Sequence, residues 1–178
     1  MQPIHLHTTR LHLGPLRADQ ATRLAELGDD PLIAAHTANI PSPYTLSAAE
    51  DFIRQSSTTG DNPAFAIELH DGSLLGVINL KLNLRHRSGH LGYWMGAPWR
   101  GHGYMTEAVQ AVLRHGFESL DLHRIHTACF AINPASARVL EKAGLALEGC
   151  SREAFCKDGV FLDLLQFGAI APGRAVDL

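Results

Sequence analysis

The spacing of hydrophobic residues changes in the middle of the chain, and this change restricts the possible fold more than any other feature. The segments 64–69, 74–84 and 90–96 are predicted strands, and Leu80, Leu82 and Leu84 alternate with polar residues as in a strand with one buried face. The dipeptides Asp71-Gly72 and Ser88-Gly89 separate these segments and predict tight turns. From residue 105 to 120 apolar residues recur every three or four positions, which predicts an amphipathic helix. We therefore expect an antiparallel meander followed by a long helix.

Shorter signals on both sides of this centre complete the expected order. Before the meander, the sequence predicts a first strand closed by Leu11, Leu13 and Leu16. Three helices follow this strand: one over 21–27, one that begins at Asp30-Pro31, and one that begins at a capping box of Ser47 and Glu50. After the long helix, it predicts a strand over 124–130, a helix from Asn133 to Gly144 and a last strand over 160–170. A mixed sheet with helices on its faces accounts for this order. The expected fold class is α/β (α+β), in a single domain.

Composition and charge exclude several classes of protein. The 178 residues are 46% hydrophobic and 19% charged, which suits one folded domain. A formal net charge of −3, with one short basic stretch at 85–90, argues against nucleic acid as a partner. No apolar run approaches the ~20 residues that span a bilayer, and residues 1–17 do not resemble a signal peptide. We therefore expect no membrane partner and a cytoplasmic location.

Cysteine and histidine raise the question of a disulfide or a metal. The three cysteines, Cys129, Cys150 and Cys156, form no CxxC pair and are expected to be free thiols of a reducing compartment. The eleven histidines fall into no HExxH or Cys/His pattern. No metal is expected.

The stretch Trp99-Arg100-Gly101-His102-Gly103-Tyr104 joins the meander to the long helix. The first N–H groups of a helix lack internal partners, and glycine lets a ligand approach the backbone, so such a turn can hold an anion. It can equally be an ordinary glycine turn before a helix. It is not a GxGxxG loop, since Thr106 occupies the last position, and it lacks the Gly-Lys-Ser/Thr of a Walker loop. The turn alone leaves both interpretations open.

Four stretches together resemble the GNAT N-acetyltransferase superfamily, in particular its RimJ/RimL-like branch. They are TTRLHLGPLR (8–17), HLGYWMGAPWRGHGYMTEAV (90–109), HRIHTACFAINPASARVLEKAGLALEG (123–149) and CKDGVFLDLLQFG (156–168). The second contains a pattern similar to the family's acetyl-CoA loop, Arg/Gln-x-x-Gly-x-Gly/Ala, with Met105 in place of the last small residue. The resemblance extends from about residue 8 to 170. It implies one acetyltransferase-like domain over 1–178, with a mostly antiparallel sheet whose fourth and fifth strands splay apart.

The resemblance also implies where acetyl-CoA binds. The pyrophosphate would be held by the backbone N–H groups of Arg100, Gly101, His102, Gly103, Tyr104 and Met105, and the pantetheine arm by the strand end Tyr93, Trp94 and Met95. Asn133 would contact the pantetheine from the other side. Ser136 would protonate the departing thiolate.

Several of these residues also have a purely structural role open to them. Asn133 can cap a helix without any ligand, and Ser136 fits the first turn of a helix. Trp94 and Trp99 can be packing aromatics or can line the acceptor groove.

The general base is also open. His90 stands on the fourth strand, where many superfamily members carry glutamate, and its ordinary pKa of about 6.5 suits proton acceptance. Glu68 and Glu153 are weaker candidates.

The implied reaction is direct transfer of an acetyl group from acetyl-CoA to a primary amine. At pH 7 about 10% of an α-amine is neutral, against less than ~0.1% of a lysine, so a protein or peptide N-terminus needs the least base assistance. The resemblance favours that acceptor. The alternatives are a small-molecule acetyltransferase, acting on an amino acid, polyamine or aminoglycoside, and a non-catalytic coenzyme A binding module. The edge of the C-terminal hairpin is compatible with a homodimer.

Overall fold

The computed structural model describes residues 3–58 and 60–173, in which eight strands form one mixed sheet of order β1-β2-β3-β4-β5-β6-β8-β7. In chain order the elements are β1 (Leu6–His7), β2 (Leu11–Pro15), α1 (Ala21–Gly28), α2 (Pro31–His36), α3 (Leu46–Thr58), β3 (Ala64–Leu69), β4 (Leu74–Asn83), β5 (Ser88–Met95), α4 (Tyr104–Glu118), β6 (Arg124–Phe130), α5 (Pro134–Ala143), β7 (Ala146–Lys157) and β8 (Val160–Ile170). Only the β5–β6 pair is parallel in these ranges. The expected mixed, mostly antiparallel sheet is confirmed.

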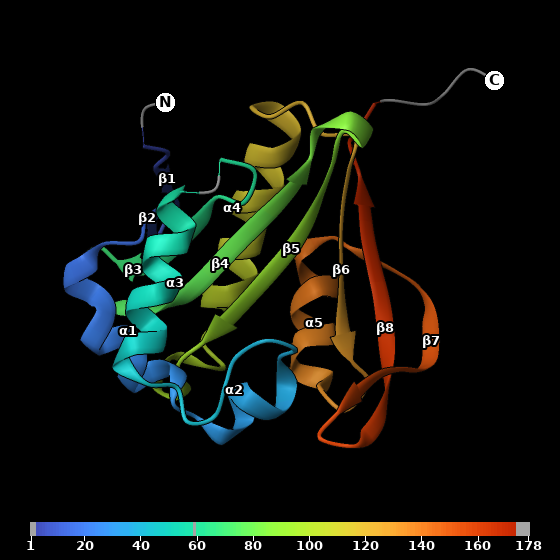
Figure 1. The fold of residues 1–178 in the computed structure, drawn as a ribbon. Coiled ribbons are helices and arrows are strands. Elements are labelled where there is room, and N and C mark those ends of the chain that lie inside the picture. The colour runs from blue at the N-terminus through green and yellow to red at the C-terminus, as the bar shows by residue number, and fades with distance from the viewer. Residues whose placement is uncertain (1–2, 59, 174–178) are drawn as a thin grey trace.

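Helices cover both faces of the sheet, and each face has its own hydrophobic core (Figure 1). On one face α4 and α5 pack over residues such as Leu80 and Leu91, which are fully buried. On the other face α1, α2 and α3 enclose a second core that contains Leu24 and Trp94. Side chains of β5 alternate between the two cores, because successive residues of a strand point to opposite faces. β5 therefore separates two distinct environments.

Two helix starts follow directly from capping chemistry. The Asp30 carboxylate accepts a hydrogen bond from the Leu32 N–H at 2.8 Å, and Pro31 occupies the first turn of α2. Asn133 and Pro134 start α5 in the same way, and Gly144, with φ of 102°, ends it. These predicted boundaries are confirmed.

The start of α3 differs from the expected one. The Thr45 hydroxyl accepts a hydrogen bond from the Ala48 N–H at 3.2 Å, and the helix begins at Leu46. The predicted capping box of Ser47 and Glu50 is wrong, because Ser47 already lies inside the first turn.

The turn between β4 and β5 lies earlier than expected. Residues 84–86 form a 3₁₀ turn, and Arg87 takes a positive φ of 48°. The predicted turn at Ser88-Gly89 is wrong, because both residues already pair with the end of β4. Leu84, expected on the buried face of the strand, is instead 66% exposed in this turn.

Candidate active site

β5 and β6 are neighbours over only part of their length. Their parallel register ends at the pair His90–His126, although both strands continue for several residues. Where they part, the buried Thr127 hydroxyl donates to the main-chain carbonyl of Leu91 at 2.7 Å. Figure 1 shows the two strands diverging from this point. The expected divergence, which we call the splay, is confirmed.

β5 leads through the glycine turn, residues 100–103, into α4. Gly101 and Gly103 have φ of 80° and 79°, which few other residues adopt. Met105 is 6% exposed in the core under α4, so its side chain does not occupy the turn. Among the hydrogen bonds of the described residues, the first N–H of the helix start with a main-chain acceptor is that of Glu107, which donates to Gly103 at 3.1 Å. The preceding N–H groups and the helix dipole can therefore hold an anion.

The side chain of Arg100 forms hydrogen bonds with other residues of the protein. Its Nε donates to the Met95 carbonyl at 3.0 Å, and a terminal nitrogen donates to Asp30 at 2.6 Å. Its own N–H donates to the Ala97 carbonyl at 3.3 Å. The Asp30 carboxylate neutralises the positive charge of Arg100. Arg100 ties the end of β5 to α2, and the free donors of the turn begin at Gly101.

The electrostatics of Asp30 agree with this contact. Partial burial alone would raise the pKa of Asp30, but hydrogen bonds from the Leu32 N–H and from Arg100 outweigh it and hold the pKa below its ordinary value. Asp30 therefore remains charged, and the ion pair persists at neutral pH.

A cation that the sequence did not single out lies beside the glycine turn. Arg10, between β1 and β2, donates to the His102 carbonyl at 2.9 Å and lies 4.5 Å from the centroid of the Tyr104 ring. Arg10 also pairs with Glu107 of α4 at 2.7 Å. Burial alone would raise the pKa of Glu107, but hydrogen bonds from Thr8 and Arg10 lower it. The turn is thus fixed from the β1–β2 side, and no local sequence signal points to this contact.

Asn133 and Ser136 lie at the start of α5, across the splay from β5. The Asn133 side-chain oxygen accepts a hydrogen bond from the Ser136 N–H at 3.1 Å, so Asn133 does cap the helix. The Ser136 hydroxyl lies 2.7 Å from the phenolic oxygen of Tyr93 on β5. Burial raises the pKa values of Tyr93 and of the nearby Cys129 thiol, against the opposing effect of hydrogen bonds to Ser136. Both groups are therefore protonated at neutral pH.

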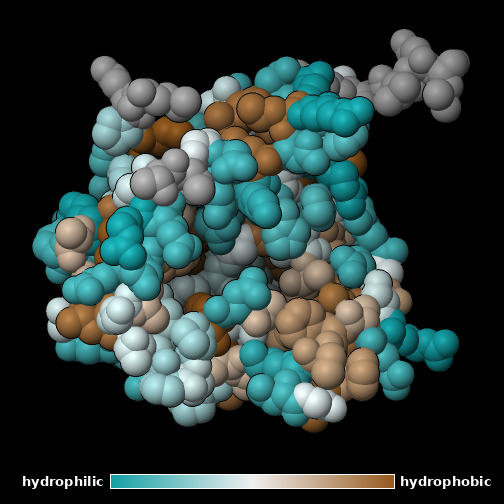
Figure 2. Space-filling view, viewed as in Figure 1, coloured by the Kyte–Doolittle hydropathy of each residue, from teal (hydrophilic) through white to brown (hydrophobic). Residues whose placement is uncertain are grey.

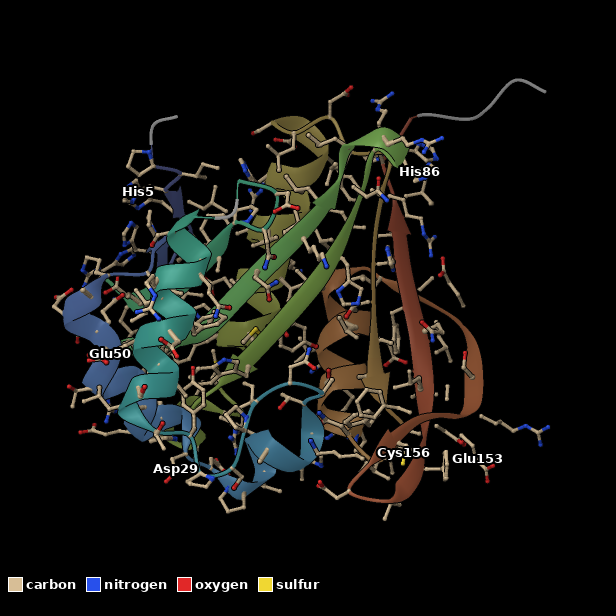
Figure 3. All side chains as sticks on the ribbon, in the orientation of Figure 1. His5, Asp29, Glu50, His86, Glu153 and Cys156 are labelled. Carbon is tan, nitrogen blue, oxygen red and sulfur yellow. The ribbon has the colours of Figure 1, made fainter. Side chains whose placement is uncertain are left out.

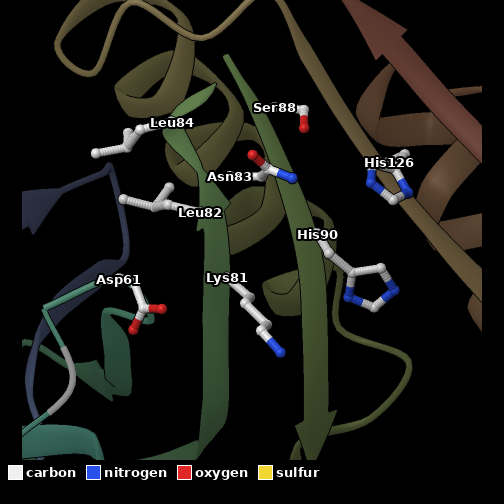
Figure 4. A pocket seen from close by; sticks show the side chains of 8 residues that line it. All are labelled: Asp61, Lys81, Leu82, Asn83, Leu84, Ser88, His90 and His126. Atoms are coloured by element: carbon white, nitrogen blue, oxygen red, sulfur yellow. The ribbon is translucent and has the colours of Figure 1, made fainter. Parts of the chain in front are cut away.

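His90 opens onto a hollow on the face of the sheet that also carries α1 to α3 (Figure 4). The hollow measures about 510 Å³ and is lined by Asp61, Lys81, Leu82, Asn83, Leu84, Ser88, His90 and His126. Figure 2 shows this side of the molecule recessed in its middle. The His90 and His126 rings lie 5.3 Å apart at 80°. Desolvation, and then the charges of His126 and Lys81, lower the pKa of His90, so its imidazole is neutral at pH 7.

The two weaker base candidates lie elsewhere. Glu68 is 4% exposed on β3 and is held by Arg17 at 3.1 Å, Gln20 at 2.9 Å and His12 at 3.3 Å. Glu153 lies on the β7–β8 hairpin at the outer edge of the sheet (Figure 3). The structure brings neither carboxylate to the splay.

The two tryptophans take packing roles. Trp94 is 8% exposed, and its ring centroid lies 6.3 Å from that of Tyr44 in the core of α1 to α3. Trp99 is partly buried and packs against both cores. The Trp94 side chain is therefore part of the core, while its backbone belongs to the free end of β5.

A model of the GNAT acetyltransferase domain matches residues 10–146. This chain belongs to the GNAT acetyltransferase family. It is 32% identical over 103 residues to the putative ribosomal N-acetyltransferase YdaF of Bacillus subtilis, covering 57% of this chain and 56% of that protein. It is 32% identical over 85 residues to the ribosomal-protein-serine acetyltransferase of Escherichia coli, covering 47% and 48%. The chain thus spans about half the length of these curated relatives.

The solved structures agree on the fold. Mycobacterium smegmatis RimJ, in complex with a CoA-disulfide, matches with a TM-score of 0.84 and 24% identity, over 96% of this chain and 90% of that one. Together with the ribosomal N-acetyltransferase relatives, this confirms the RimJ/RimL-like resemblance.

Three further properties concern residues 3–58 and 60–173 only. In these ranges no helix is long and apolar enough to cross a membrane. The same residues contain no group of three His, Cys, Asp or Glu side chains arranged to hold a metal ion. The cysteines are free, as predicted, with Cys129 buried and Cys150 and Cys156 exposed.

Proposed function

We propose that this protein transfers the acetyl group of acetyl-CoA to a primary amine, with a protein or peptide N-terminus as the preferred acceptor. The observation that carries the proposal is the splay, which ends at the glycine turn and has Ser136 on its far side. The residues present fit the coenzyme. Free N–H groups from Gly101 to Met105 suit a pyrophosphate, and the side of β5 that β6 leaves beyond His90 suits the amides of a pantetheine arm.

The residues of the splay then have distinct tasks. Acetyl-CoA supplies the acetyl group as a thioester. Main-chain N–H groups of Tyr93 and Met95, which point away from β4, orient and polarise its carbonyl. Asn133 caps α5 through its oxygen and offers its side-chain NH₂ to the pantetheine. Ser136 donates its hydroxyl proton toward the sulfur as the carbon–sulfur bond breaks.

His90 acts as the general base from the hollow on the other face of the sheet. A base must be neutral to accept a proton, and the lowered pKa of His90 provides this at pH 7. The proton removed from the amine passes to His90 directly or through one water molecule. An α-amine suits this arrangement because about 10% of it is already neutral at pH 7.

The acceptor is proposed from the relatives. YdaF and the Escherichia coli enzyme are named for ribosomal proteins, and an N-terminal amine is the chemistry that such an acceptor offers. Homodimerisation through the exposed edge strand β7 belongs to the same proposal, and analytical ultracentrifugation tests it.

Release of free thiol from acetyl-CoA tests the proposal, measured against peptides, amino acids, polyamines and aminoglycosides, with mass spectrometry to locate the acetyl group. We expect the fastest turnover with peptides acetylated at the N-terminus. Faster turnover with a small amine would contradict the assigned acceptor. Tight coenzyme binding without turnover of any acceptor would identify a binding module instead.

A pair of matched variants tests the seat of the coenzyme. Gly101 and Gly72 have φ of 80° and 87°, and an added Cβ meets no atom within 4 Å at either position. Gly101→Ala and Gly72→Ala therefore introduce the same backbone strain, about 1–2 kcal/mol. We expect only Gly101→Ala to weaken coenzyme A binding, by about tenfold. Equal affinities of the two variants would contradict the seat at the glycine turn.

A further inference from the structure

Tyr93 of β5 and Ser136 of α5 meet across the splay through their side-chain hydroxyl groups. The phenolic oxygen of Tyr93 lies 2.7 Å from the Ser136 hydroxyl oxygen and 3.4 Å from the Ser136 carbonyl oxygen. β5 and α5 are separate elements, so this bond links the strand proposed to bind the thioester with the helix that carries the proposed acid.

The two contacts of Tyr93 indicate the direction of its proton. A carbonyl oxygen can only accept, so Tyr93 is the donor in its 3.4 Å contact with the Ser136 carbonyl, whereas either hydroxyl can donate in the 2.7 Å contact. A phenolic proton that lies between the two oxygens of Ser136 serves both. The hydroxyl proton of Ser136 is then not used in the bond to Tyr93 and remains available to a third group. The opposite arrangement would direct the Ser136 proton at Tyr93 and away from the splay.

We propose that Tyr93 is a positioning residue that donates to the Ser136 hydroxyl and thereby directs the Ser136 proton toward the sulfur of the bound thioester. This inference rests on the proposed function, because it assigns a helper to the proposed acid. Tyr93 itself keeps its proton throughout, since burial holds its pKa above the ordinary value of a phenol.

The transfer step balances without any further reactant. The bond that forms joins the amine nitrogen to the carbonyl carbon, and the bond that breaks joins this carbon to sulfur, which leaves with the electron pair. The neutral amine loses one proton to His90, and the sulfur gains one from Ser136. Ser136 is reprotonated and His90 is deprotonated by solvent before the next cycle, so the net proton change is zero.

Cys129 is the third group at this contact. Its buried thiol lies near both hydroxyls and interacts with each. Burial raises its pKa, so it is a neutral thiol with a weak donor. A weak donor does not replace the phenol of Tyr93, so loss of the phenol has a measurable effect.

The test compares Tyr93→Phe, Ser136→Ala and the double variant with the wild-type chain, using acetyl-CoA and the best acceptor. Tyr93→Phe removes one oxygen and keeps the ring. We expect kcat to fall about tenfold, with the KM for acetyl-CoA within about twofold, because one hydrogen bond to the acid is lost. In the Ser136→Ala background the same change has no further effect, because the group that it positions is gone. A purely structural role would lower kcat in both backgrounds.

Tyr44→Phe is the matched control. Tyr44 is a buried tyrosine, 6% exposed, whereas Tyr93 is partly buried, and Tyr44 lies in the core on the other face of the sheet. We expect its kcat to match the wild type. An unchanged kcat in Tyr93→Phe, or a loss that persists in the Ser136→Ala background, would overturn the assignment.

A second variant keeps the assignment testable if Tyr93→Phe does not fold. A ring-fluorinated tyrosine at position 93 keeps the hydroxyl and the shape but lowers the pKa of the phenol. Since a phenolate cannot donate, kcat should fall at a lower pH on the basic side than in the wild type. An identical pH profile would overturn the assignment. If the wild-type chain binds coenzyme A but acetylates no amine, the proposed function and this inference are both overturned. If the wild type is active and the variants at position 93 have the same kcat and pH profile, only this inference is overturned.

Discussion

The hydroxyl of Thr127 donates to the main-chain carbonyl of Leu91 at 2.7 Å, at the point where β5 and β6 part. A side chain here replaces the ladder hydrogen bond that the diverging strands no longer provide. Thr127 is 5% exposed, so the bond is shielded from water.

Thr127→Val should therefore destabilise the protein. The variant keeps the shape of the side chain but leaves the Leu91 carbonyl without its donor, which costs about 1–3 kcal/mol. Urea unfolding measures the change in the free energy of unfolding. Thr127→Ser keeps the hydroxyl and should recover part of the loss. A Thr127→Val protein as stable as the wild type would show that Thr127 does not support the splay.

The ion pair of Arg100 with Asp30 is the second contact that supports the site. Arg100→Met removes the bonds to Asp30 and to the Met95 carbonyl, and it leaves the mostly buried Asp30 carboxylate without its cationic partner. We expect a loss of about 1–3 kcal/mol in the free energy of unfolding. The control is Arg54→Met, which breaks an exposed pair with Asp51 and should cost at most about 0.5 kcal/mol. Similar losses in both variants would contradict the role of Arg100.

The pH dependence of transfer should report His90. The pKa of His90 is lowered, so the fall of kcat/KM that belongs to this base should lie below its ordinary value of about 6.5. His90→Gln should lower kcat about 100-fold and abolish this acidic limb. Rates as a function of pH, with one acceptor throughout, provide the measurement. The fall of kcat/KM caused by protonation of the acceptor amine, whose pKa is about 7.7–8.0, should remain in His90→Gln. If the additional fall below pH 6.5 also remained unchanged, His90 would be excluded as the base.

The stability of the protein should also depend on pH through His115. This α4 histidine has a buried Nε2 without a hydrogen-bond partner among the described residues, and desolvation lowers its pKa. The unfolded chain, with a pKa of about 6.5, binds a proton before the folded state does. The contribution of His115 to the free energy of unfolding is therefore fully present above pH 6.5. This contribution is lost as the pH falls through the lowered pKa that His115 has in the folded state.

His115→Leu should accordingly flatten the pH dependence of the free energy of unfolding below pH 6.5. His86→Gln, at an exposed position in the β4–β5 turn, serves as the control and should leave that dependence unchanged. Denaturant unfolding at several pH values gives both curves. Equal slopes for His115→Leu and the wild type would show that His115 does not titrate differently on folding.

The sequence predicted most elements of the fold because their signals are local. The apolar runs of β3 to β5, the stripe of α4 and the Asn133-Pro134 start of α5 each depend on residues close in the chain. The errors are also local: Thr45 competes successfully with Ser47 as the cap of α3, and the turn before β5 closes at Arg87. Alternative helix caps or turn positions that lie a few residues apart differ little in free energy, so the sequence pattern does not decide between them.

The residues of the candidate active site could be predicted only where they belong to a sequence pattern of the family. The glycine turn and Asn133 with Ser136 come from such a pattern, whereas the partners that fix them do not. Arg10 reaches the turn from the β1–β2 connection, and Tyr93 reaches Ser136 from another element. These contacts join residues that are distant in the chain, so only the packed structure shows them.

The most direct measurement is the change in backbone amide chemical shifts when coenzyme A is added to the isotope-labelled protein. The account predicts the largest changes at Gly101 to Thr106 and at Gly92 to Met95, with small changes at the β7–β8 hairpin. Changes centred elsewhere, with the amides of the glycine turn unmoved at saturating coenzyme A, would contradict the assignment of this turn and the splay as the acetyl-CoA site.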